Sequence, residues 1–294
     1  MSRNDQVHRG RAPASPPAVL AALLTAGSPS DDLYSTEGSR LYERLAEFDV
    51  SEQTALLRLL AGTDGDILEL ACGGGRLAFP LLSLGRPVTG LDLSPEMIRA
   101  LEERYRALPA SRRTVPLTGV VGDMRDFVLG GVFGAIVLGT TSMLLLDEEG
   151  RRRLYASVRR HLAPGGRFFV SVPGKAMAPG STSTRVVPLR GETPSVAIVS
   201  DHVRVGGRTR DVSILHLSRP EGGDLVTREF SSTVFLLTAG ELDRELAEAG
   251  FTLADTVIAD TVAAGTATAG TVAADTATAG GGAEGGLLVR GYTA

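Results

Sequence analysis

The order of apolar and polar positions divides the chain into an alternating region, a strand-rich region and a short return to alternation. In the first region, short apolar runs that end in glycine or an acidic residue are separated by stretches with helical periodicity. We predict strands over residues 66–71, 87–92, 115–122, 134–139 and 167–172. We predict helices over 33–60, 76–84, 94–107 and 147–162. Such alternation is typical of a parallel sheet covered by helices on both faces.

The second region, 186–238, has a period of two. Its segments at 196–205, 209–218 and 225–237 are separated by glycine pairs and read as antiparallel strands joined by hairpin turns. A helix over 239–249 and strands over 251–258 and 286–292 follow. The predicted fold class is therefore α/β: a Rossmann-like seven-stranded sheet with helices on both faces and an antiparallel β insertion after the fifth strand. We place the insertion, 175–238, over the carboxyl edge of the sheet.

Two segments have no pattern that builds a core. Residues 1–30 are rich in Pro, Ser, Arg and Ala, and we expect a mobile N-terminal tail before a single domain spanning 31–294. Residues 261–270 and 271–280 are near-identical stretches of Thr, Ala and Gly. A solenoid needs at least three repeats, so we interpret 259–285 as a flexible loop between the last two strands.

The composition of the chain argues against some classes of function. Thirty basic residues against thirty-four acidic ones give a net charge of -4, which argues against nucleic-acid binding because that requires a basic face. The single cysteine, Cys72, is compatible with a reducing, cytoplasmic location. No run approaches the roughly 20 apolar residues of a membrane span, so we expect no membrane association. A monomer and a homodimer are both compatible with the sequence.

The glycine-rich segment 69–76, ELACGGGR, closes the first strand of the sheet and opens a helix. Glycines there, including Gly73 and Gly75, permit a tight turn and let a ligand approach the backbone beside a helix N-terminus. Taken alone, the spacing also fits a dinucleotide fingerprint. A turn that only packs the helix, without any ligand, is a further interpretation.

Acidic residues at strand ends favour an adenosyl ligand with a cationic end. Asp92 ends the second strand, where a carboxylate accepts both ribose hydroxyls. Asp123 ends the third strand and can accept an adenine amine, an interaction for which dinucleotide enzymes have no regular need. Glu69, just before the turn, suits a positively charged amino-acid group and repels a pyrophosphate; a capping role is its alternative.

With these residues in place, the chain resembles class I S-adenosylmethionine-dependent methyltransferases, through ELACGGGR, TGLDLSPEMI (89–98), GDMRDF (122–127) and LAPGGRFFV (162–170). The resemblance implies S-adenosylmethionine as cofactor and no metal. It also implies which positions hold the cofactor: the methionine part by the glycine turn, the ribose by the acid of the second strand, and the adenine by the acid–methionine pair of the third. The cofactor-binding residues implied are Glu69, Ala71, Gly73, Gly75, Asp92, Leu93, Met97, Asp123, Met124 and Gly139.

A narrower resemblance concerns the acceptor. LYSTEGSRLYERL (33–45), the β-rich insertion and FLLTAGELDRELAEAGF (235–251) are similar to N,N-dimethyltransferases of aminodeoxysugars, in which N-terminal tyrosines close over the site. Residues 138–166 also resemble methyltransferases of daptide-type ribosomal peptide pathways, which dimethylate a C-terminal amine. The resemblance implies an amine acceptor on a small molecule or modified peptide. We expect catalytic roles for Tyr34, Tyr42 and Thr141, whose hydroxyl groups can orient or deprotonate the amine; helix packing is the alternative for the two tyrosines.

One departure bears on the mechanism. The aminosugar enzymes carry a histidine just beyond the fourth strand, whereas this chain has an apolar run over 143–146. His8, His161, His202 and His216 are poorly placed to replace it. We therefore expect an N-methyltransferase that relies on desolvation and positioning of a neutral amine. An O- or C-methyltransferase, a non-catalytic binding module and a nicotinamide-dependent oxidoreductase are the alternatives.

Overall fold

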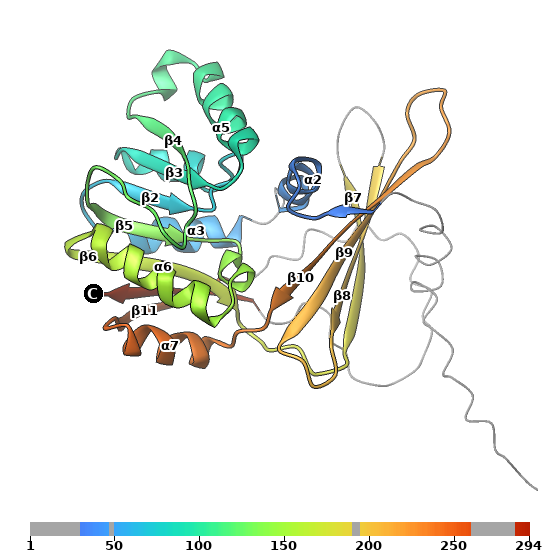
Figure 1. Cartoon of the computed structure of the whole chain (residues 1–294). Coiled ribbons are helices and arrows are strands. Elements are labelled where there is room, and N and C mark those ends of the chain that lie inside the picture. The colour runs from blue at the N-terminus through green and yellow to red at the C-terminus, as the bar shows by residue number, and fades with distance from the viewer. Residues whose placement is uncertain (1–29, 47–49, 190–194, 260–285) are drawn as a thin grey trace, which may run out of the picture.

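The computed structural model describes residues 30–46, 50–189, 195–259 and 286–294. The expected mobile tail over 1–30 and the expected flexible loop over 259–285 lie almost entirely outside these residues. Within them, two sheets are present. One has seven strands in the order β11-β12-β6-β5-β2-β3-β4, and the other has five in the order β1-β10-β9-β8-β7. The two sheets lie on opposite sides of helix α2 (Figure 1).

The seven-stranded sheet confirms the predicted fold class. Its strands are β2 (Ile67–Leu70), β3 (Val88–Asp92), β4 (Leu117–Val121), β5 (Phe133–Leu138), β6 (Leu162–Pro173), β11 (Thr252–Ala259) and β12 (Leu287–Thr293). The first five are parallel, whereas β12 is antiparallel to both β6 and β11. In the sheet, β2 lies between β3 and β5. The chain therefore runs from β2 to β3 and β4 on one side, and then crosses back to β5 on the other side of β2. Ligands of open α/β sheets bind at such a switch point, beyond the carboxyl ends of the strands.

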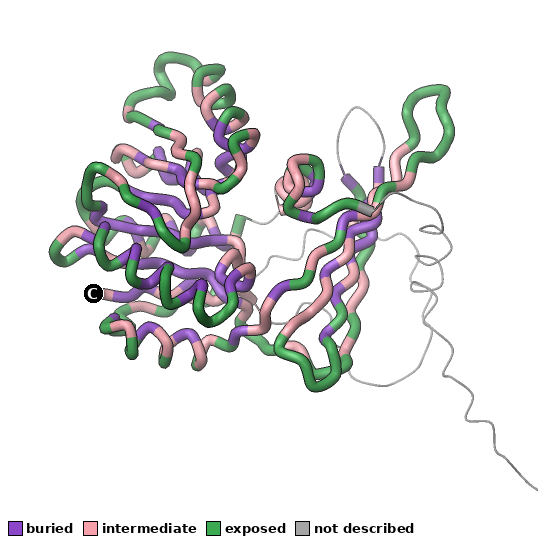
Figure 2. Tube along the Cα trace, in the orientation of Figure 1, coloured by how far each residue is buried: buried purple, intermediate pink, exposed green. Residues whose placement is uncertain are grey.

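Helices cover both faces of this sheet. Their bounds are α3 (Ser51–Leu60), α4 (Ala78–Leu81), α5 (Pro95–Ala107), α6 (Glu148–His161) and α7 (Ala239–Glu248), with 3₁₀ turns η1 (Leu82–Leu84), η2 (Ala110–Arg112) and η3 (Ser142–Leu145). Alternate residues of the strands face opposite layers. Phe168 packs in the core with α6 and α7, and Phe169 packs in the core with α3, α4 and α5. Both are fully buried, and the buried residues follow the central strands in Figure 2.

Helix α5 begins as its sequence predicts. The Ser94 hydroxyl accepts the Met97 N–H at 3.3 Å, and Pro95 is the first helical residue. A side-chain N-cap followed by proline is a strong helix start, because both satisfy or remove a backbone donor that has no partner within the helix.

The second sheet consists of β7 (Thr182–Leu189), β8 (Ser195–Val203), β9 (Thr209–Ser218), β10 (Val226–Phe235) and the short β1 (Ser30–Asp32). β7 to β10 are antiparallel, as expected for the insertion, and β1 pairs in parallel with β10. Two of these strands were not predicted. β7 is an exposed edge strand that contains Pro188, and β1 has only three residues, so neither has a clear period-two signal.

Three predicted boundaries were wrong. The helix expected over 33–60 is two helices, α2 (Thr36–Ala46) and α3. The helix expected over 76–84 is the single turn α4 followed by η1, because Pro80 and the left-handed Gly85 limit it. The fifth strand begins at Leu162 instead of 167, and the Pro164–Gly166 segment is an irregularity inside it, where the pairing with β5 shifts register.

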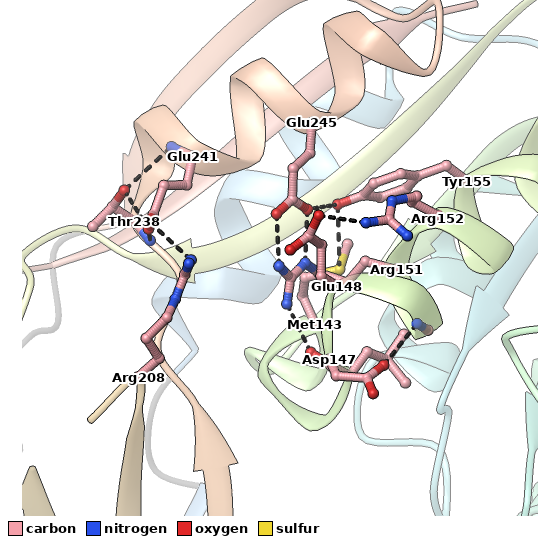
Figure 3. Close-up of polar contacts among 12 residues, drawn as sticks. Met143, Asp147, Glu148, Arg151, Arg152, Tyr155, Arg208, Thr238, Glu241 and Glu245 are labelled. Carbon is pink, nitrogen blue, oxygen red and sulfur yellow. Dashed lines mark hydrogen bonds and ion pairs between the residues drawn. The ribbon is translucent and has the colours of Figure 1, made fainter. Parts of the chain in front are cut away.

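A buried ion pair ties α6 to α7 (Figure 3). The Arg151 guanidinium donates to both carboxylate oxygens of Glu245, at 2.7 and 2.6 Å, and to the Leu146 carbonyl at 2.8 Å. The Tyr155 hydroxyl donates to the same carboxylate at 3.0 Å. Helix α7 directly follows β10 of the five-stranded sheet. The Arg151–Glu245 pair therefore fixes the end of that sheet to α6, close to Leu146.

Candidate functional site

A cavity of about 650 Å³ opens at the carboxyl ends of the central strands, beneath α2. It lies at the switch point of the seven-stranded sheet. Its walls come from the ends of β2, β3 and β4, from the residues after β5, and from the segment 34–46. The lining residues that the argument uses are Tyr34, Tyr42, Glu43, Glu69, Ala71, Gly73, Arg76, Asp92, Leu93, Met97, Asp123, Met124, Arg125, Thr140 and Ser142.

Most of the residues expected to hold a cofactor line this cavity, but Gly75 and Gly139 do not. Gly75 has φ +95°, and a Cβ there would lie 2.4 Å from a Leu101 methyl carbon and 2.7 Å from the Phe79 ring. A Cβ on Gly139 would lie 2.2 Å from Leu77. Both glycines therefore permit close packing behind the cavity. Gly73, with φ +53°, is the glycine of the turn that faces the cavity.

Asp92 links the end of β3 to the glycine turn. One carboxylate oxygen accepts the Gly73 N–H at 2.8 Å, and the other accepts the Ser94 N–H at 2.9 Å. Each carboxylate oxygen has two lone pairs, so both oxygens retain acceptor capacity toward the cavity. The geometry fits the acceptance of two ribose hydroxyls.

Glu69 is 3% exposed and lines the cavity, and its Oε2 atom has no hydrogen-bond partner in the described structure. Burial raises the pKa of this carboxyl well above its usual range, against the opposing effect of Arg76. A buried carboxylate oxygen without a partner is costly unless a ligand supplies one. A ligand ammonium group is a suitable partner, so the residues present fit the amino-acid end of S-adenosylmethionine.

Glu43, on α2, is a lining residue that the sequence did not single out. Its carboxylate accepts the Gly74 N–H at 2.5 Å, and a Cβ on Gly73 would lie 2.6 Å from the same oxygen. Three acidic residues, Glu43, Glu69 and Asp92, line this wall, where the Arg76 guanidinium is already paired with Glu52. A ligand with a sulfonium and an ammonium group complements that excess of negative charge.

The residues expected at the adenine end have different surroundings. Asp123 lies at the rim, and Arg125 donates to both of its oxygens, at 2.5 to 3.0 Å. This contact lowers the pKa of Asp123. Met97 is 3% exposed and Leu93 is 69% exposed, so only Met97 is already enclosed by the protein. Whether these residues flank an adenine stays a prediction.

Tyr34 and Tyr42 both line the cavity. Burial raises the pKa of each phenol, and the nearby charges of Arg210 and, for Tyr34, Asp201 modify it. Both phenols are therefore neutral hydrogen-bonding groups over the physiological pH range. Thr140 and Ser142 also line the cavity, whereas Thr141, expected to be catalytic, does not.

None of the described histidines lines the cavity. The His161 ring is held inside the protein, where Nε2 accepts the Leu129 N–H at 3.0 Å and Nδ1 donates to the Ser157 carbonyl at 2.8 Å. His202 contacts the Thr182 hydroxyl on the five-stranded sheet. His8 lies outside the described residues. Cys72 does line the cavity, but burial raises the pKa of its thiol well above the usual value, which disfavours the nucleophilic thiolate.

Two further observations concern the described part of the chain as a whole. It contains no cluster of three or more His, Cys, Asp and Glu side chains arranged to hold a metal ion. It also contains no helix that is both long enough and apolar enough to cross a membrane.

Comparison with known proteins agrees with this geometry. A family model described as a methyltransferase domain matches residues 67–166. Over 210 residues, the chain is 32% identical to the dTDP-3-amino-3,4,6-trideoxy-alpha-D-glucopyranose N,N-dimethyltransferase of Streptomyces venezuelae, which covers 70% of this chain and 81% of that protein. Over 143 residues, it is 26% identical to a cypemycin N-terminal methyltransferase from a Streptomyces species, covering 48% and 56% respectively.

Among solved structures, the glycopeptide N-methyltransferase MtfA superposes with a TM-score of 0.58 and 29% identity. The match covers 96% of this chain and 99% of that one. MtfA has also been solved in complex with S-adenosylmethionine.

Proposed function

The chain belongs to the S-adenosylmethionine-dependent methyltransferases, and we propose that it transfers two methyl groups to a primary amine of a natural-product intermediate. Its cofactor is S-adenosylmethionine, which supplies an activated methyl group. The observation that carries the choice of an amine is the acceptor end of the cavity. Four of the residues that line the cavity, Tyr34, Tyr42, Thr140 and Ser142, present hydroxyl groups there. Such groups can orient a neutral amine but are poor bases for deprotonating an alcohol or phenol.

The chain's own residues then act mainly by positioning. The glycine turn with Glu69 and Asp92 would hold the cofactor, and the neutral hydroxyl groups would hold the amine on the axis of the methyl group. Orientation of two reactants in a desolvated site supplies a large part of the barrier reduction. Because no histidine or lysine is among the described residues that line the cavity, the amine reaches its reactive, neutral form by losing its proton to water.

Our first candidate for the acceptor is the C-terminal amine of a daptide-type ribosomal peptide, on the resemblance of residues 138–166. Peptide acceptors are also compatible with the similarity to MtfA, a glycopeptide N-methyltransferase, and to the cypemycin N-terminal methyltransferase.

The second candidate is a nucleotide-linked aminosugar, and a specific charge cluster favours it. Asp201 on β8 is 7% exposed and pairs with Arg210 at 3.1 Å and with Arg185 at 3.8 Å. The Arg210 Nε is buried without a partner in the described structure. The cluster carries a net positive charge beside Tyr34 and Tyr42, so it suits the diphosphate of an acceptor such as that named for the Streptomyces venezuelae relative.

The proposal is tested by mass spectrometry with purified protein and S-adenosylmethionine. The acceptors are a peptide with a C-terminal primary amine, a dTDP-linked 3-amino sugar and a phenol. Two methyl increments on either amine, with the phenol unchanged, support the proposal and select the acceptor class. Methylation of the phenol alone contradicts it and indicates an O-methyltransferase.

A further inference from the structure

The backbone that follows β5 is held in an unfavourable conformation. Thr140 and Thr141 both have φ +57°, in the left-handed region that β-branched residues rarely adopt. Such a conformation is energetically unfavourable and persists only where surrounding contacts hold it. Thr140 lines the cavity, so these contacts bear directly on the site.

Glu52, on α3, provides the principal contact. It is 4% exposed, and its Oε1 accepts the Thr140 N–H at 2.6 Å. Its Oε2 pairs with the Arg76 guanidinium, and the same Arg76 Nη2 donates to the Thr140 hydroxyl at 2.7 Å. Gly139 makes this approach possible, because a Cβ there would lie 3.0 Å from the Glu52 carboxylate. The strained backbone is therefore held through both its N–H and its side chain.

The second partner, Arg76, connects Thr140 to the glycine turn. Arg76 directly follows the glycine turn and lines the cavity beside Glu69. The Arg76 guanidinium thus links the glycine turn, which would hold the cofactor, to Thr140 after β5, which would contact the acceptor. Glu52 binds both Arg76 and the Thr140 N–H. In an in-line transfer, a displacement of about 1 Å between the reacting groups can reduce the rate about 100-fold.

We propose that Glu52 is a positioning residue for methyl transfer: with Arg76 it holds Thr140–Thr141 in the left-handed conformation and so fixes the acceptor amine relative to the methyl donor. This inference rests on the proposed function for its kinetic consequence. Its structural consequence, a rigid segment over 139–146, is independent of the acceptor.

The test uses Glu52→Gln, which keeps the side-chain size and an oxygen that can accept the Thr140 N–H but removes the charge paired with Arg76. The matched control is Glu148→Gln on α6, where the glutamate of an exposed pair with Arg152 undergoes the same chemical change. The readouts are hydrogen exchange of residues 139–146 by mass spectrometry, the Kd of S-adenosylmethionine, and kcat and KM for the amine methylated in the acceptor panel.

For Glu52→Gln we expect faster exchange in this segment and a kcat reduced about tenfold or more, with Kd and KM changed less than about threefold. The control should match the wild type. Unchanged exchange and kcat would overturn the proposal, and so would a loss of kcat that only follows a weaker Kd. The exchange readout still tests the inference if no amine is methylated, in which case the proposed function alone fails.

A second variant covers the case in which Glu52→Gln does not fold. Thr140→Ala removes the hydroxyl that Arg76 contacts and leaves the Glu52–Arg76 pair in place. We expect the same pattern, a lower kcat and faster exchange with cofactor affinity retained. Wild-type kcat and exchange in this variant would contradict the proposal.

Discussion

Asp92 and Gly73 are joined by a hydrogen bond of 2.8 Å from the Gly73 N–H to the Asp92 carboxylate. The bond connects the ends of β2 and β3. The residue expected to bind the ribose, Asp92, therefore also positions the glycine turn expected to bind the methionine part of the cofactor. A substitution at Asp92 should therefore affect the cofactor more than the fold, because the side chain lies at the cavity wall and not in the core.

For Asp92→Ala we predict a weaker Kd for S-adenosylmethionine by about 100-fold or more. The reason is the loss of two charge-assisted hydrogen bonds to the ribose, each contributing about 1.5–3 kcal/mol. Isothermal titration calorimetry measures this directly. Asp126→Ala removes an exposed carboxylate paired with Arg160 and serves as the control. Wild-type affinity in Asp92→Ala would contradict the assignment of the ribose site.

The raised pKa of Glu69 predicts a pH-dependent affinity for the cofactor. A carboxyl whose pKa is raised is protonated in the unliganded protein above its ordinary value of 4.5, and a cationic ligand favours its ionised form. Cofactor binding should therefore release a proton and become tighter as the pH rises through the raised pKa. Calorimetry in buffers with different ionisation enthalpies detects the proton. In Glu69→Gln both the proton release and the pH dependence should disappear, whereas proton release that persists would assign it to another group.

The same shift has a consequence for stability. Above pH 4.5 the unfolded chain ionises Glu69 before the folded protein does, so burial of this group costs increasing stability as the pH rises toward the folded pKa. The unliganded Glu69→Gln variant should then be more stable than the wild type at neutral pH and equally stable well below pH 4.5. Thermal melting across this range tests the sign. A variant less stable than the wild type at neutral pH would show that the carboxylate is already satisfied.

The raised pKa values of the Tyr34 and Tyr42 phenols predict a simple pH–rate profile. The rate should rise as the acceptor ammonium loses its proton and show no second inflection from a tyrosine below about pH 10. Tyr34→Phe and Tyr42→Phe should each lower kcat/KM by roughly fivefold, the equivalent of one neutral hydrogen bond, without changing the shape of the profile. A change of shape in either variant would indicate a phenolate that acts as a base.

The Arg210–Asp201 pair predicts how the two acceptor candidates can be separated. Arg210→Gln should raise KM for a nucleotide-linked aminosugar by about tenfold or more, because a charge-assisted contact to a phosphate is lost. KM for an uncharged peptide amine should change little. Arg204→Gln is the matched control, since Arg204 pairs with Asp211 on the same sheet and is more exposed. Equal effects of Arg210→Gln on both acceptors would remove the anion-binding role.

The parallel sheet, and the position of Gly73 and Asp92 at its edge beside the cavity, could be predicted because their determinants are local in the sequence. A buried strand that ends at Gly73 or Asp92 places that residue at the sheet edge, whatever the rest of the chain does. The prediction also assigned the ligand-facing role to Gly75 and Gly139, which instead pack against Leu101 and Leu77. Spacing alone does not distinguish a glycine that faces a ligand from one that faces a side chain.

The residues missed by the sequence interpretation come from elsewhere in the chain. Glu43 and Glu52 lie on amphipathic helices, where a glutamate normally faces solvent, and only the tertiary structure brings them to the glycine turn and to Thr140. The same holds for Asp201, which is buried on a strand of the insertion. These contacts depend on how the N-terminal helices and the five-stranded sheet pack over the central strands, which no local pattern encodes.

The central claim is that this cavity delivers the methyl group of S-adenosylmethionine to an amine nitrogen. The most direct measurement is an NMR spectrum of the product formed from S-adenosylmethionine labelled with ¹³C in its methyl group. Two equivalent labelled methyl groups on one nitrogen, correlated to the adjacent carbon of the acceptor, are the predicted result. A labelled methyl group on oxygen or carbon, with the amine unmodified, would contradict the account.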